Sequence, residues 1–151
     1  KLNPTLKSPL CIELTGFNPM NAILCMCGFS SSGVCLAIAL KAKKKEVRVI
    51  GPSATASALL GIGEPALFGV LLRYNIKPFI LSCCVNGVAG MIAMIIGLQG
   101  TGNGITTIPG ILLYIYSPHQ LIMYIILAAV TFISAFVLAW IFVVPKEVME
   151  E

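Results

Sequence analysis

Charged residues are scarce in this chain of 151 residues. They make up 11% of it, whereas apolar residues make up 58%. A soluble domain carries roughly twice that charged fraction. Most of the charges gather in 41–48, at Arg73 and Lys77, and after 145, with long apolar runs between them. This distribution excludes an ordinary soluble enzyme and predicts an all-α integral membrane protein with several spanning helices.

Acidic residues are almost absent from the apolar part of the chain. Between Val47 and Pro145 the only one is Glu64. The net charge of +4 comes from a few bases, and these flank the apolar runs instead of forming a broad patch. We interpret them as signals of membrane topology, so we expect contact with membrane lipid and none with nucleic acid.

Patterns that would indicate metal binding or secretion are also missing. The six cysteines include no CxxC pair with a matching His, and five of the six lie inside apolar runs, where cysteine packs as a small apolar residue. We therefore expect no metal, no cofactor and no catalytic residue on this chain. No signal-peptide pattern occurs and the chain opens with Lys1, so we expect a piece of a longer polypeptide.

Three uncharged runs are long enough to form helices that cross a membrane. They cover about 22–40, 79–97 and 121–144. Residues 1–20 are rich in turn formers and indicate a loop or an interfacial segment, and 146–151 form a charged cytoplasmic tail. The first run contains three consecutive serines, which need hydrogen-bond partners in an apolar environment. We expect them to face protein or a cavity.

A fourth apolar run, 49–72, is broken by several glycines and prolines. A single straight helix is disfavoured there, and we predict a re-entrant hairpin of two short arms with a turn at 61–65. Such a hairpin leaves the bases of 41–48, Arg73 and Lys77 on one side of the membrane, as the positive-inside rule prefers. A full crossing would divide these bases between the two sides.

The Gly- and Thr-rich stretch 98–118 has two possible structures. It is either an external loop or a second re-entrant segment. In the second case Asn103, Thr106 and Thr107 would line a pocket, and in the first they would form a plain turn. Four aromatic residues near the ends of the runs are typical of membrane-interface belts: Tyr114, Tyr116, Tyr124 and Trp140.

Glu64 lies inside the broken run. A carboxylate in hydrocarbon costs at least ~2.5 kcal/mol, so such a residue normally faces a wet cavity or a bundle interior and marks a substrate or ion path. Discontinuous helices often surround such sites in transporters. The alternative is structural, with Glu64 capping the second arm or pairing with Arg73.

The residues around Glu64 resemble a known signature. GIGEPALFGV, residues 61–70, is similar to the G-I-T-E-P-A-[IL]-[FY]-G-V motif of enzyme IIC, the membrane permease of the sugar phosphotransferase system, glucose superfamily. The sucrose, trehalose and β-glucoside branch is nearest. Four further stretches resemble blocks of this family in the same order: GFNPMNAI (16–23), GVCLAIALKAKKKEVR (33–48), LRYNIKPFI (72–80) and GITTIPGI (104–111). The chain departs from the pattern at Gly63 and Thr107, where the family has Thr and Gly.

This resemblance implies a function and partners. The family imports a sugar and passes it to a IIB domain, which phosphorylates it from a phosphocysteine. Residues 21–145 would be the C-terminal part of the IIC transport domain. The protein would cross the bacterial cell membrane several times. The implied substrate is a disaccharide or a β-glucoside, and the implied partners are IIB and IIA domains and a second copy of the permease. The substrate-binding residues we expect are Glu64, Gly61, Gly63, Thr106 and Asn103.

Two other functions remain compatible with the residues. In an ion- or proton-coupled carrier, Glu64 would be the proton site, and uptake would need no phosphoryl donor. In a degenerate, non-transporting membrane component, Glu64→Gln would change no measurable activity. No cysteine of this chain lies in a pattern like the phosphorylated cysteine loop of IIB, so phosphoryl transfer is expected on another domain or chain.

Overall fold

A computed structural model describes residues 17–18, 20–73, 76–102 and 107–142. Most of these residues are helical, and within these ranges the only strand-like pairing is a single bridge between Asn18 and Gly100. The predicted all-α class is confirmed. The elements in chain order are α2 (Met20–Lys41), α3 (Lys45–Leu59), α4 (Glu64–Ala66), the π-helical η2 (Leu67–Leu71), α5 (Lys77–Ile96), the 3-10 helix η3 (Pro109–Tyr114) and α6 (Pro118–Phe142).

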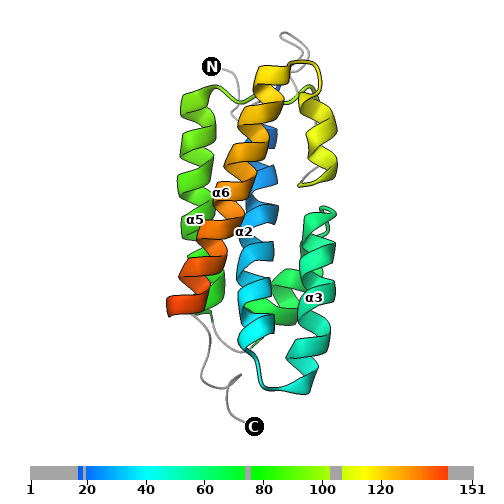
Figure 1. Cartoon of the computed structure of the whole chain (residues 1–151), viewed down its shortest axis with the longest axis vertical. Helices are drawn as coiled ribbons and strands as arrows, with labels where there is room; N and C mark the ends of the chain where they lie inside the picture. Colours follow the sequence, from blue (N-terminus) through cyan, green and yellow to red (C-terminus); the bar gives the residue numbers. More distant parts are fainter. Residues whose placement is uncertain (1–16, 19, 74–75, 103–106, 143–151) are drawn as a thin grey trace, which may run out of the picture.

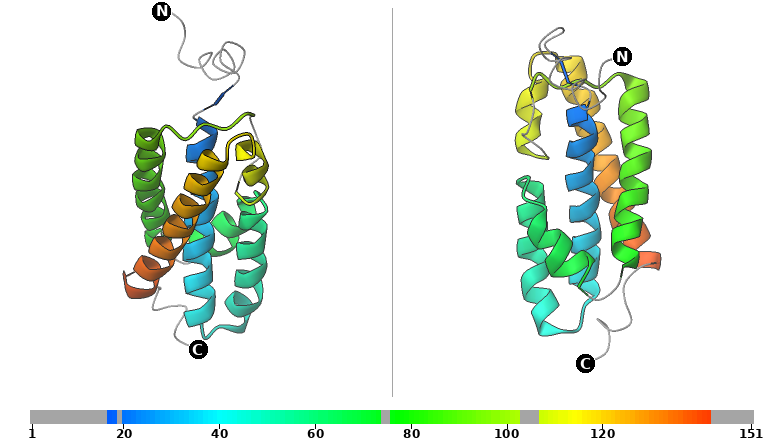
Figure 2. Two further views of the ribbon diagram at one scale, coloured as in Figure 1. Left: turned by 45° about the horizontal axis from the view of Figure 1, so that its top comes forward. Right: turned by 180° about the vertical axis from the view of Figure 1, so that it is seen from behind.

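Three helices, α2, α5 and α6, are long and apolar enough to cross a membrane. They lie over the three uncharged runs of the sequence and pack side by side, as Figures 1 and 2 show. The central helix is α2, of which 61% of the most apolar stretch is buried, against 28% for α5 and for α6. The outer faces of α5 and α6 expose apolar side chains, such as Ile95 and Ile133, which suit contact with lipid or with further apolar protein.

Hydroxyl groups join α2 to α5 midway along the bundle. Ser82 of α5 shares hydrogen bonds of 3.1 Å with both Ser30 and Ser31 of α2. The hydroxyl of Ser32 donates to the carbonyl of Phe29 within α2, at 2.9 Å. The three consecutive serines therefore have the partners that an apolar environment requires.

Residues 45–73 fold back on themselves, and we call them the Glu-Pro hairpin. The chain enters through α3, turns at 60–63 and returns through α4 and η2 (Figures 1 and 2). Arg73 at the exit forms an ion pair of 2.8 Å with Glu46 at the entrance, so both ends of the hairpin lie at the same end of the bundle. The predicted hairpin is thus confirmed, and the alternative of a single helix that crosses fully is not. Its first arm is longer than expected, because α3 begins inside the basic stretch 41–48, which is therefore not all loop.

Residues 97–117 form what we call the Gly-rich segment, of which 103–106 lie outside the described residues. The segment starts at the end of the bundle opposite the base of the Glu-Pro hairpin, and η3 (yellow in Figure 1) runs back to that end from mid-height. The described part of the segment therefore dips into the bundle instead of forming an external loop.

Two of the four aromatic residues near the run ends are not in interface belts. Tyr114 of η3 and Tyr124 of α6 are fully buried, and their rings stack with centroids 4.4 Å apart. The expectation for these two residues is wrong, because they supply the core beneath the Gly-rich segment. Tyr116 and Trp140 are on the surface, as an interface position requires.

The apolar core forms two clusters along α2. Val47, Val70 and Leu71 of the Glu-Pro hairpin pack with the C-terminal half of α2. Tyr114 and Tyr124 pack with the N-terminal half, together with apolar residues of α5. Each broken segment has its own core, and the tips of the two segments meet near the middle of the bundle (Figure 1).

Candidate functional site

The turn of the Glu-Pro hairpin is open to its surroundings, with all five residues from Gly61 to Pro65 exposed. Gly61 has a φ of 96°, in the range that residues with a side chain disfavour, so this turn needs glycine. Gly63 has a φ of −83°, and a Cβ atom added there meets nothing within 4 Å. The backbone therefore requires glycine at 61 but not at 63.

Glu64 is the first residue of α4 and is followed by Pro65, which suits the first turn of a helix. Its side chain is exposed, and within the described part of the chain it forms no ion pair. Arg73, the alternative partner considered from the sequence, binds Glu46 instead. An ionised carboxylate only accepts hydrogen bonds, at about four lone-pair sites. At membrane depth it must meet water, a ligand or protein, because hydrocarbon cannot solvate it.

The described part of the tip of the Gly-rich segment, Thr107 and Ile108, contacts other elements, whereas the hairpin turn is exposed. Thr107 is 1% exposed, and the Tyr124 hydroxyl donates to its carbonyl oxygen at 2.6 Å. The backbone N–H of Ile108 donates to the carbonyl oxygen of Leu59, the last residue of α3, at 3.0 Å. The two tips approach from opposite ends of the bundle and are joined by this backbone hydrogen bond.

The structure brings Gly61, Gly63 and Glu64 together in one exposed turn. The other two expected binding residues, Asn103 and Thr106, lie outside the described residues, so their role stays a prediction. The contact between the two tips could not be found from sequence patterns, because it joins backbone atoms of residues whose side chains are ordinary apolar ones.

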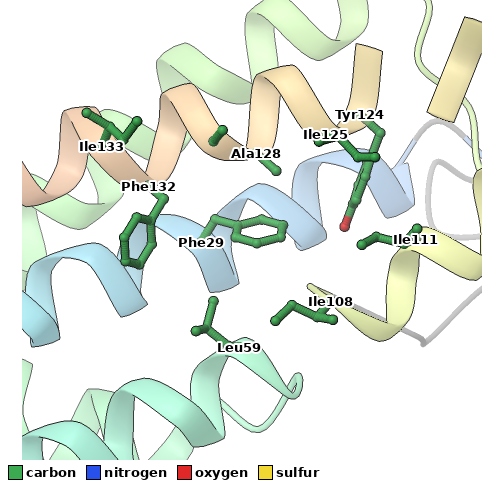
Figure 3. A pocket seen from close by; sticks show the side chains of 10 residues that line it. Phe29, Leu59, Ile108, Ile111, Tyr124, Ile125, Ala128, Phe132 and Ile133 are labelled. Carbon is green, nitrogen blue, oxygen red and sulfur yellow. The ribbon is translucent and has the colours of Figure 1, made fainter. Parts of the chain in front are cut away.

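A pocket of about 370 Å³ lies beside the meeting point of the tips (Figure 3). In Figure 3, Leu59 and Ile108 lie on one side of Phe29 and the side chains of α6 on the other. Its lining carries no charged group and does not include Glu64, so the pocket lacks the acceptors that sugar hydroxyls need. The lining residues are Phe29, Leu59, Ile108, Ile111, Tyr124, Ile125, Ala128, Ala129, Phe132 and Ile133.

The described ranges contain no group of three His, Cys, Asp or Glu side chains that could hold a metal ion together. The cysteines described there are free thiols. What this region offers a ligand is the hydrogen-bonding capacity of Glu64 and of the exposed backbone around it, with apolar side chains alongside.

Comparison with known proteins identifies several EIIBC components as relatives. The chain is 33% identical over 135 residues to the PTS system sucrose-specific EIIBC component of Bacillus subtilis, which covers 87% of this chain and 29% of that protein. It is 34% identical over 121 residues to the sucrose-specific EIIBC component of Salmonella typhimurium, with coverage of 80% and 26%. It is 39% identical over 100 residues to the N-acetylmuramic acid-specific EIIBC component of Photorhabdus laumondii, with coverage of 66% and 20%.

The chain spans about a quarter of the length of the curated relatives it matches. A match over 87% of the chain necessarily includes the Glu-Pro hairpin and most of the Gly-rich segment. No protein-family model matches the chain, and no solved structure matches it.

Proposed function

Because this chain belongs to the IIC permeases of the sugar phosphotransferase system, in their sucrose/glucose branch, we propose that it is the C-terminal part of a permease that binds a sugar and carries it inward. It is a multi-pass membrane protein, with three helices able to cross. We assign 21–145 to the transport domain, 1–20 to a loop or interfacial segment and 146–151 to a cytoplasmic tail. The membrane is the bacterial cell membrane.

The observation that carries this proposal is the exposed carboxylate of Glu64 in the turn of a broken helix, which forms no ion pair within the described ranges. Sugars present several hydroxyl donors, and hydrogen bonds to an ionised acceptor are shorter and stronger than those between neutral groups. Glu64 accepts these donors in the proposed complex. Gly61 shapes the turn, and Gly63 leaves the carboxylate accessible because no side chain stands beside it.

The proposed substrate is a disaccharide or a β-glucoside. Relatives named as specific for sucrose and for N-acetylmuramic acid support a sugar ligand. The open space at Gly63, where the family pattern has Thr, bears on which sugar fits. In this proposal a IIB domain, itself phosphorylated by IIA, phosphorylates the sugar after transport, and the permease works as a homodimer.

A binding experiment on Glu64 tests the proposal. Radiolabelled sucrose, trehalose and aryl-β-glucosides are titrated onto membranes that carry the complete permease, as wild type, as Glu64→Gln and as Glu46→Gln. Hydrogen bonds to a charged group contribute about 1.5–3 kcal/mol each. Glu64→Gln is therefore expected to weaken binding by roughly 10- to 100-fold. Glu46→Gln is the matched control, since its carboxylate pairs with Arg73 at the exposed base of the hairpin.

Each contrary result has a defined meaning. Equal affinity of wild type and Glu64→Gln for a bound sugar would remove Glu64 from the site. Uptake that varies with pH and needs no phosphoryl donor would favour an ion-coupled carrier. Absence of binding to every sugar in a correctly folded protein would favour a non-transporting component.

A further inference from the structure

Thr107 has an unusual backbone conformation for its residue type. Its φ is 59°, in the left-handed region, and it is the only described residue other than glycine with a positive φ. A β-branched side chain disfavours this region, and such strain persists only where the surrounding structure holds it. Glycine would adopt the same conformation freely. Threonine holds it here against the preference of its own side chain.

Space for that side chain comes from Gly28 of α2. A Cβ atom added to Gly28 would lie 2.9 Å from Thr107 Cγ2 and closer still to Oγ1, and its three nearest neighbours are all side-chain atoms of Thr107. We call this space the Gly28 notch. Glycine inside a helix is unfavourable relative to alanine, so the notch also has a cost that its occupant offsets.

The peptide group between Thr107 and Ile108 forms hydrogen bonds at both its carbonyl oxygen and its N–H. Its carbonyl oxygen accepts the hydroxyl of Tyr124, and the next amide, that of Ile108, donates to the carbonyl of Leu59. Leu59 ends α3, and the carbonyls of a final helical turn lack partners within the helix. The tip of the Gly-rich segment thus caps the end of the arm that leads into the Glu64 turn.

We propose that Thr107 is a positioning residue for the Glu64 turn. Seated in the Gly28 notch, it aims the Ile108 amide at the Leu59 carbonyl and fixes the point from which the chain turns toward Glu64. Its hydroxyl oxygen is buried and has no hydrogen-bond partner among the described residues, so the shape of the side chain carries this role. The link to sugar affinity rests on the function proposed above for Glu64, whereas the link to tip geometry does not.

The first test measures the contact between the tips without any sugar. Cysteines are placed at Leu59 and Ile108 of the complete permease, disulfide formation is driven with copper phenanthroline, and the cross-linked peptide is quantified by mass spectrometry. The two single-cysteine variants control for native thiols. Gly28→Ala and Thr107→Gly are each expected to lower the cross-linking rate about threefold or more, since such factors correspond to small shifts in a local equilibrium.

The pair of substitutions is then combined, because the notch predicts that their defects do not add. Gly28→Ala with Thr107→Gly should show the cross-linking rate of Thr107→Gly alone, because the added methyl group then meets no Thr107 side chain. Gly33→Ala is the matched control on α2. Its added Cβ atom would meet the Phe132 carbonyl oxygen at 2.6 Å, and Thr107 is not among its three nearest neighbours. Any loss of cross-linking rate that Gly33→Ala causes should therefore remain when Thr107→Gly is added.

The second test measures sugar affinity in the same variants. Thr107→Gly should weaken binding about tenfold without lowering the melting temperature, and Thr107→Val, which keeps the shape and loses the hydroxyl, should bind as wild type does. Wild-type cross-linking and affinity in Thr107→Gly, or a cross-linking defect in the double variant as large as the two single defects multiplied together, would overturn the inference. If no variant and no wild type binds sugar, the proposed function fails, while the cross-linking rates still decide whether Thr107 positions the tip.

Discussion

The Glu-Pro hairpin and the Gly-rich segment both interrupt their helices with glycine and proline, yet they end in opposite ways. The hairpin turn leaves the residues from Gly61 to Pro65 exposed, including a carboxylate without an ion-pair partner in the described ranges. At the described tip of the Gly-rich segment Thr107 is buried, and the backbone groups of Thr107 and Ile108 both have hydrogen-bond partners in other elements. The turn of the Glu-Pro hairpin is therefore accessible to a ligand, whereas Thr107 and Ile108 are hydrogen-bonded to neighbouring elements.

The side chains around each break explain this difference. Beneath the Gly-rich segment lie the stacked rings of Tyr114 and Tyr124, which bury its inner face and supply a hydroxyl donor. The hairpin turn contains glycines and Glu64 instead of aromatic residues. Its apolar contacts lie further along the returning arm, at Val70 and Leu71. A tip held by hydrogen bonds beside an open one is the arrangement expected where a site must be preorganised and still accessible.

Replacement of Gly61, at the hairpin turn, gives the largest expected effect on stability. Gly61→Ala places a Cβ atom at a φ of 96° and should cost about 1–3 kcal/mol. Gly63→Ala is the control, because its φ is ordinary and the added atom meets nothing, so its effect should lie within about 0.5 kcal/mol. Thermal unfolding of the purified permease in detergent measures both. Equal melting temperatures for the two variants would show that the turn is not held in this conformation.

Periodicity and charge placement were enough to predict the three long helices and the hairpin. The Arg73–Glu46 ion pair shows that the two ends of the hairpin meet directly, and the side of the membrane on which they lie stays a prediction. The sequence could not place Tyr114 and Tyr124, since an aromatic residue near the end of a run fits either an interface or a core. It also gave no sign of the bond from Ile108 to Leu59, because backbone groups are the same in every residue.

Removal of one hydroxyl at the closed tip should give an intermediate effect. Tyr124→Phe keeps the ring stack with Tyr114 and loses the 2.6 Å hydrogen bond to the Thr107 carbonyl. Hydrogen bonds between membrane helices are worth about 0.6 kcal/mol on average and reach about 1.7 kcal/mol. Tyr116→Phe is the control, because its hydroxyl donates to Gln99 at the exposed end of the same segment. A larger loss of stability in the control than in Tyr124→Phe would contradict the closed tip.

Neutralisation of the ion pair at the hairpin base should have the smallest effect. The side chains of Arg73 and Glu46 are 38% and 68% exposed, and exposed pairs contribute about 0.2–1 kcal/mol. A double-mutant cycle with Glu46→Gln and Arg73→Gln, measured by thermal unfolding, should therefore give a small coupling that declines as salt is raised. A coupling well above 1 kcal/mol would mean that charge, and not packing, holds the two ends of the hairpin together. A small coupling would leave that role to Val47, Val70 and Leu71, whose burial in the core needs the same geometry.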